Sequence, residues 1–153
     1  MSASPNDQEF LAAVKSLETC LMTPRISGEL ERWVDAVESA INCVGTALVR
    51  QINQEHRAEF RQITSDDPEL HSRVERLKSG DTHSLEQDRS LRDRIHSVKK
   101  NVLRIEPDEG RLEPALVEFC ADGLAYVLHL RKQEVAIETW LQESFSRDRG
   151  TGD

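Results

Sequence analysis

Residues 70–105 read LHSRVERLKSGDTHSLEQDRSLRDRIHSVKKNVLRI, and this stretch decides the fold. Apolar residues recur in it at intervals of three and four, the spacing of one face of an α-helix. The row consists of Leu70, Val74, Leu77, Leu91, Ile95, Val98, Val102 and Ile105. Asp81, Ser84 and Asp88 take consecutive places in its middle. The pattern predicts one long amphipathic helix whose buried face is interrupted by polar groups.

Gly80 leaves a second interpretation open for this stretch. Glycine costs a helix about 1 kcal/mol relative to alanine. Residues 79–82 are therefore an alternative place for a kink or a short loop that splits the helix. The polar residues would then need no buried role.

Three further segments show helical spacing of apolar residues. The predicted helices cover Asp7–Met22, a second segment from a Ser27 cap through Ile63, and a last segment that begins near Pro114. Asp66 or Asp67 is expected to cap the long helix, with Pro68 at its first position. Short connections make consecutive long helices antiparallel neighbours. We therefore expect an all-α, antiparallel up-down-up-down four-helix bundle.

Length and charge narrow the class of protein. A chain of 153 residues with 31% charged and 5% aromatic residues fits one helical domain over 1–153, with loose ends at about 1–6 and 147–153. The net charge of -8 argues against nucleic acid and against an anionic membrane as partners, because both attract basic surfaces. No apolar run approaches the roughly 20 residues that cross a bilayer.

The cysteines and the first residues bear on the compartment. Cys20, Cys43 and Cys120 form no CxxC pair and lie beside apolar residues, so we expect free thiols in a reducing environment. Residues 1–8 lack the cationic start and apolar run of a secretory signal. A cytoplasmic protein is the expectation.

Polar residues also interrupt the other helices at a similar height. Gln51 and Glu55 stand on the apolar side of the second helix, and Gln133 and Glu134 on that of the last. At 1.5 Å per residue, Gln51 and Asp81 each lie about 20 Å from the turn that joins their helices. Residues 6–9 of the first helix reach the same level. These groups are expected to meet in one polar layer.

Buried carboxylates are costly unless they are paired, hydrogen-bonded or bound to a cation, which leaves three interpretations of this layer. The helices splay and admit water, or an arginine such as Arg50, Arg73 or Arg131 completes a satisfied network, or the layer holds a metal. The candidate ligands are Glu55, Asp81, His129 and Glu134, with Gln51 or His83 at the edge. Such oxygen-rich ligands suit iron, manganese or magnesium.

The histidines favour the interpretations without metal. No two of them are four residues apart and no Glu-x-x-His occurs, so the ligand pairs typical of di-iron bundles are missing. His56 with Glu59, and His71 with Glu75, fit pairs on helix surfaces instead.

The chain nevertheless resembles the hemerythrin-like four-helix bundle proteins. The resemblance rests on Asp67 to Leu85, which contains Pro68-Glu69-Leu70 and Val74-Glu75-Arg76-Leu77, and on His129-Leu130-Arg131-Lys132-Gln133-Glu134 in the last helix. It implies that the family's His-x-x-x-Glu of the second helix corresponds to Gln51 through Glu55. The next ligand histidine would fall near Asp81 or His83, and the last near His129.

This resemblance implies a relative that has lost oxygen binding, because a hemerythrin di-iron centre needs several imidazoles. The chain also has no glycine-rich phosphate loop and no nucleophile elbow. We therefore expect a non-enzymatic bundle without a complete di-iron site and without a cofactor, acting as a structural or protein-interaction module. Its partner is an unknown protein or a second copy that uses the surface of Trp33 or Trp140, unless these side chains are core. The alternative is a metal-binding or iron/oxygen-sensing bundle with a carboxylate-rich site.

Overall fold

The computed structural model describes residues 3–104 and 108–151, and the regular structure in them is helical throughout. The elements are α1 (Pro5–Met22), α2 (Leu30–Arg50), the π-helical turn η1 (Gln51–His56), α3 (Arg57–Asp66), the 3-10 turn η2 (Pro68–Leu70), α4 (His71–Val102) and α5 (Glu109–Thr151). No strand occurs among these residues. The predicted all-helical class is confirmed.

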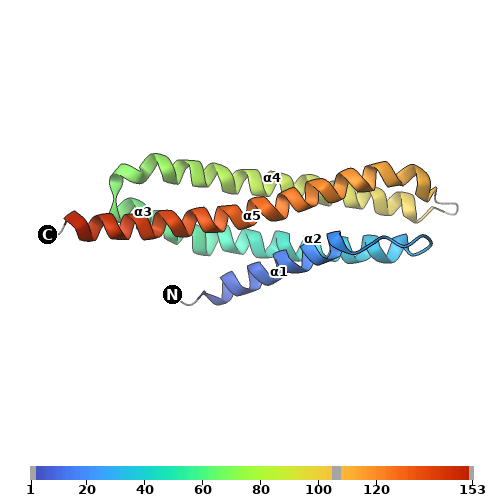
Figure 1. Cartoon of the computed structure of the whole chain (residues 1–153), viewed down its shortest axis with the longest axis horizontal. Coiled ribbons are helices and arrows are strands. Elements are labelled where there is room, and N and C mark those ends of the chain that lie inside the picture. Colours follow the sequence, from blue (N-terminus) through green and yellow to red (C-terminus); the bar gives the residue numbers. More distant parts are fainter. Residues whose placement is uncertain (1–2, 105–107, 152–153) are drawn as a thin grey trace.

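The helices lie lengthwise beside one another (Figure 1). Because α2, η1 and α3 follow each other without a break, residues 30–66 form one continuous helix, which we call the second arm. In Figure 1 the chain turns back at alternate ends of the bundle, and both termini lie at the same end. α1 packs on α2 and α5, whereas α4 contacts both the second arm and α5.

The buried apolar residues form two clusters that differ in which helices supply them. The larger cluster takes residues from α1, α2, α4 and α5, among them Phe10, Leu17 and Ile41. The smaller consists of Phe60, Ile63, Leu70, Val74, Leu77 and Ile137 and receives nothing from α1. Along α5, Leu130 belongs to the first cluster and Ile137 to the second. The polar layer therefore lies where a four-helix core gives way to a three-helix core.

Of the helix caps predicted from the sequence, the one before α4 is confirmed and the one before α2 is wrong. Asp67 caps the turn that leads into α4, accepting from the backbone N–H of Glu69 at 3.0 Å, and Pro68 follows it as expected. Ser27 does not cap α2, because its hydroxyl donates to Glu109 Oε2 at 3.2 Å and the helix begins later, at Leu30.

The last helix begins earlier than the sequence suggests. α5 starts at Glu109, and Pro114 lies inside it. The carboxylate of Asp108 accepts from the backbone N–H of Arg111 at 3.2 Å, which satisfies one donor of the first turn. At the other end α5 continues through Arg147 to Thr151, and α1 already begins at Pro5, both within the segments expected to be loose. Ile105, the predicted end of the long helix, lies outside the described residues.

α4 is continuous through Gly80, so the alternative of a kink at residues 79–82 is wrong. The glycine serves packing instead. A Cβ atom built at Gly80 would lie 2.3 Å from Oε1 of Gln133 on α5. Only a residue without a side chain lets the Gln133 amide approach this part of α4.

Candidate functional site

The π-helical turn decides which side chain of the second arm enters the polar layer. The backbone N–H of Arg57 donates to the carbonyl of Ile52, five residues earlier, so the turn holds one residue more than an α-helical turn. Gln51, His56 and Phe60 are consequently buried, whereas Glu55 and Glu59 are only half-buried. The expectation that His56 pairs with Glu59 on the surface is wrong, because counting at 3.6 residues per turn assigns the inward position to Glu55.

His56 lies between two carboxylates that come from different helices. Its Nδ1 is 2.9 and 3.0 Å from the carboxylate oxygens of Asp81 on α4, and its Nε2 contacts Oε1 of Glu134 on α5. The imidazole is 1% exposed. One ring thus joins the second arm, α4 and α5 at the boundary between the two apolar clusters.

This environment holds His56 in its protonated form. Burial by itself lowers the pKa of a histidine, but hydrogen bonds to Asp81 and Glu134 and the charges of both carboxylates outweigh it and raise the pKa of His56 to about 10. The imidazolium then donates from both nitrogens. The result is an ion triad, Asp81–His56–Glu134, in which His56 and Asp81 are buried, Glu134 is half-buried, and both N–H donors of the ring have acceptors.

Two glutamines extend the triad. Gln133 Nε2 donates to the Leu77 carbonyl at 2.5 Å and to Asp81 at 3.1 Å. Gln51 Nε2 donates to Glu134 Oε2 at 3.2 Å and also contacts the carboxylate of Asp7 in the first turns of α1. The predicted meeting of all four helical segments at this level is therefore confirmed by side-chain contacts.

A second group of carboxylates lies next to the triad, near the start of α1. Asp7, Glu55 and Glu59 each offer an oxygen, and these oxygens lie within 4.8 Å of one another. Asn6 donates to Glu55 Oε1 at 3.1 Å. Burial raises the pKa of Glu59 to about 7, and the neighbouring carboxylates add to this, while the charge of His56 acts against it. We call these three residues the acidic cluster.

The four predicted metal ligands fall in three different places. Asp81 and Glu134 belong to the triad, where they face the two nitrogens of His56. Glu55 belongs to the acidic cluster. His129 Nε2 lies 3.0 Å from the Gly80 carbonyl, and its ring contacts exposed His83 with centroids 4.9 Å apart.

The residues do not fit a di-iron centre of the kind that the resemblance implies. That centre needs several imidazoles. The chain's five histidines all lie in the described ranges, and only His56 has ring nitrogens that contact carboxylates of this layer. Both of its nitrogens are already engaged by the triad.

A smaller polar site lies further along α4. Asp88 accepts from the hydroxyl of Tyr126 at 3.1 Å and contacts the guanidinium of Arg92. Burial raises the pKa of Asp88, although Arg92 and Tyr126 oppose this. The two buried aspartates in the middle of α4 therefore both have partners on neighbouring helices. Asp81 contacts His56 and Gln133, and Asp88 contacts Tyr126.

Sequence patterns contained one signal for His56. In an unbroken α-helix Phe60 would stand roughly a quarter turn or more away from the face shared by Ile41 and Leu48. This change of phase between two apolar groups, across the polar stretch Gln51 to His56, is the trace that a π-helical turn leaves in sequence.

Comparison of the chain with protein families, with curated proteins and with solved structures gave no match. Within the described ranges, none of the helices combines the length and the apolar character that crossing a membrane requires.

Proposed function

We propose that this chain is a non-enzymatic, hemerythrin-like bundle of the up-down-up-down type, and that it works as a structural or protein-interaction module that pairs with a second copy of itself. The observation that carries the proposal is an apolar stripe on the outer face of α5. Its members are Val117, Leu124, Leu128 and Val135, with exposed fractions of 56%, 36%, 52% and 63%. Single exposed apolar residues are ordinary, but a row of them on one helix face is typical of an interaction surface.

The spacing of the α5 stripe supports pairing between helices. Seven, four and seven residues separate its members, the repeat of a coiled-coil seam, in which a straight helix drifts by only about 20° per seven residues. Phe119, Tyr126 and Leu130, on the opposite side of α5, are buried in the bundle. The stripe therefore faces away from the molecule.

The order of the stripe suits a second copy better than an unrelated partner. Val, Leu, Leu and Val at intervals of 7, 4 and 7 residues read the same in both directions. A two-fold axis that passes between the two helices, midway along α5 between Leu124 and Leu128, would place Val117 opposite Val135 and Leu124 opposite Leu128 of an antiparallel partner. Two-fold dimers need such a self-complementary surface.

The two tryptophans proposed from the sequence as a dimer surface expose less of their side chains than the α5 stripe does. Trp33 is 7% exposed and its Nε1 donates to the Cys20 carbonyl at 3.2 Å. Trp140 is half-buried against the smaller apolar cluster and lies under the guanidinium of Arg73, 5.0 Å from the ring centroid.

The triad supports a module without metal chemistry. The imidazolium of His56 supplies the positive charge that buried Asp81 and half-buried Glu134 require. This arrangement corresponds to the satisfied network considered from the sequence, with a histidine in place of an arginine.

Dimerisation is tested by light scattering coupled to size exclusion over a range of protein concentration. We expect a mass of about twice 17.4 kDa for the native chain. Leu128→Glu places charge in the middle of the seam and should give a monomer with unchanged helix content. Val49→Glu is the matched control, because Val49 is 49% exposed but lies on α2, away from the stripe. A native monomer at all concentrations, or a dimer that Leu128→Glu leaves intact, overturns the pairing.

A metal-binding bundle is the second candidate, and the acidic cluster favours it. Oxygen ligands from Asp7, Glu55 and Glu59 converge within 4.8 Å. Within the described part of the chain, the buried Oε1 of neighbouring Gln51 has no hydrogen-bond partner. Such oxygen donors suit manganese or iron.

Elemental analysis of protein from cells supplied with iron and manganese, together with melting curves with and without chelator, decides between the two candidates. About one ion per chain and a chelator-sensitive melting temperature would establish the metal site, because binding to the folded state raises stability. Glu59→Gln should then reduce the metal content.

A further inference from the structure

A groove between the second arm and α4 carries chemistry that the proposed function does not use. It has a volume of about 450 Å³ and lies beside the triad, with Asp81 in its wall. Ile52, Phe60, Val74 and Leu85 give it apolar surface. Its size falls within the range of roughly 300–1,000 Å³ that is common for small-molecule sites.

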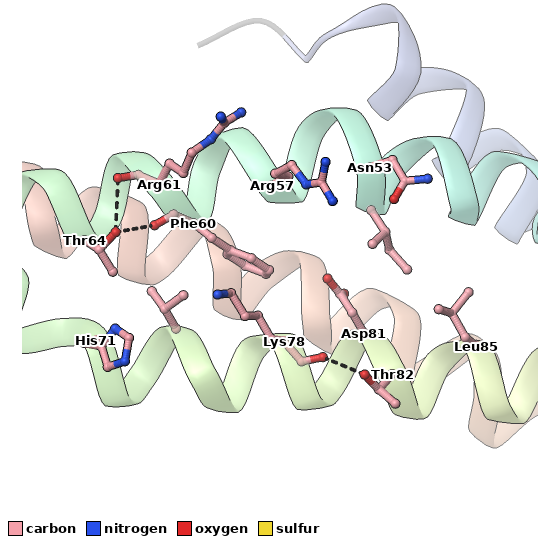
Figure 2. Close-up of a pocket in the computed structure, with 12 residues that line it drawn as sticks. Asn53, Arg57, Phe60, Arg61, Thr64, His71, Lys78, Asp81, Thr82 and Leu85 are labelled. Atoms are coloured by element: carbon pink, nitrogen blue, oxygen red, sulfur yellow. Dashed lines mark hydrogen bonds between the residues drawn. The ribbon is translucent and has the colours of Figure 1, made fainter.

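The charged residues around the groove are mostly cationic, in a chain whose net charge is -8. Arg57 and Arg61 line it from successive turns of α3, and Lys78 lines it from α4. Figure 2 shows Arg57 and Lys78 reaching toward the space between the helices from opposite walls, whereas Arg61 points away. An anion in this space would meet positive charge from both sides.

Carboxylates of the protein neutralise little of the positive charge in the groove. In the described part of the chain Arg57 and Arg61 take part in no ion pair shorter than 4.0 Å, and Lys78 has a 3.2 Å contact to exposed Glu75. Exposed pairs of this kind contribute little. Asp81, the one carboxylate that lines the groove, is held by His56 and by Gln133.

Polar uncharged groups stand at both ends of the apolar surface. Thr64 Oγ1 donates to the Phe60 carbonyl at 3.1 Å and Thr82 Oγ1 to the Lys78 carbonyl at 3.3 Å, which leaves oxygen lone pairs free to accept. The Asn53 side chain is exposed on the wall of the second arm. A ligand here needs one anionic group for Arg57 and Lys78 and an apolar body for Phe60 and Leu85.

From this arrangement we infer that the groove is a binding site for a small amphipathic carboxylate, such as a medium-chain fatty acid or an aryl-substituted acid. The carboxylate lies between Arg57 and Lys78, where the planar guanidinium offers two parallel N–H donors. The apolar body covers Ile52, Phe60 and Leu85. The site shares no residue with the α5 stripe, so the inference stands independently of the proposed pairing.

The test is a titration of the ¹⁵N-labelled full chain with octanoate, followed by the amide shifts. We expect saturable shifts confined to the groove, around Arg57, Phe60, Lys78 and Leu85. Arg57→Gln and Lys78→Gln should each weaken binding about three- to five-fold, the effect of losing one partly exposed charge contact. Arg89→Gln and Lys100→Gln are matched controls on α4, because both side chains are exposed and line no part of the groove.

Acetate and inorganic phosphate complete the experiment as probes without an apolar body. We expect no saturation with either at concentrations that saturate octanoate binding. Equal responses to all three anions, or octanoate binding that Arg57→Gln and Lys78→Gln leave unchanged, would mean unspecific attraction of anions and overturn the inference. Octanoate shifts that map to the α5 stripe would overturn it as well.

Discussion

Because His56 is protonated in the folded protein, the free energy of unfolding should fall as the pH rises, and this fall should extend well above the pH at which histidines ordinarily titrate. The folded-state pKa of His56 is raised from 6.5 to about 10, which corresponds to about 5 kcal/mol of free energy of unfolding. Because the folded pKa is the higher one, this contribution is complete below about pH 6.5 and is lost as the pH rises toward about 10.

The effect of His56 is largest relative to that of other groups between about pH 7.5 and 8.5. Glu59, with its pKa raised to about 7, has largely titrated below this interval. Burial raises the pKa of Cys20 and of Cys120, so these thiols ionise first in the unfolded state and add a smaller fall in stability with rising pH, which His56→Gln shares with the native chain. Within this interval we expect His56 to lower the free energy of unfolding by about 1 kcal/mol, close to the limiting slope for one proton.

Urea unfolding of the native chain and of His56→Gln at both pH values measures this slope. The variant should lose most of this slope, and should be less stable by about 3–5 kcal/mol near pH 7, because Asp81 and Glu134 remain without their cation. If the variant does not fold, the ¹⁵N shifts of the His56 ring in the native chain give the pKa directly. A ring that titrates near 6.5, or equal slopes for both proteins, refutes the protonated triad.

Three further predictions concern the triad, the smaller polar site at Asp88 and the π-helical turn. Gly80→Ala should destabilise the protein by about 1–3 kcal/mol in thermal melts in spite of better helix propensity, because the new Cβ displaces the Gln133 amide from Leu77 and Asp81. In a protein that already carries Gln133→Ala, adding Gly80→Ala should cost little further stability. A stabilising effect of Gly80→Ala alone would contradict the contact. Tyr126→Phe should cost about 1–2 kcal/mol in urea unfolding, because Asp88 loses its buried hydroxyl donor; an unchanged midpoint would show that Arg92 alone satisfies the carboxylate. A variant that lacks Asn53 should still fold into a helical protein, as measured by circular dichroism. The deletion shortens the π-helical turn to an ordinary α-helical turn, so that His56, Phe60 and Ile63 still face inward. Loss of cooperative unfolding in this variant would contradict the assigned helix register.

Much of this fold follows from apolar spacing alone. The rows on α1, α2, α4 and α5 predict amphipathic helices, and the buried row on α4 includes Asp81, Ser84 and Asp88 at the predicted positions. Helix ends were less predictable: the Ser27 hydroxyl bonds to Glu109 instead of capping a helix, and Pro114 lies inside a helix whose first turn Asp108 already caps. The hemerythrin-like likeness stays a prediction.

The site was only half accessible from sequence, for a physical reason. Asp81 and Glu134 could be placed at one height by counting helical rise, because they lie on regular helices. His56 was not placed, because its position depends on a hydrogen bond to the fifth rather than the fourth preceding carbonyl, which no single residue type specifies and only the change of apolar phase between Leu48 and Phe60 indicates. Gln133 is another such case, since its role depends on the space that Gly80 leaves on another helix.

The π-helical turn also affects how this chain should be aligned with any relative found later. An α-helical relative would need one residue fewer between Gln51 and His56, so a correct alignment carries a gap inside a helix, where gaps are ordinarily penalised. An ungapped alignment would equate Glu55 with the inward-facing position and assign a carboxylate where the interior holds an imidazole. Searches that allow a single-residue gap at positions 51–56 are therefore the ones to use for finding relatives of this protein.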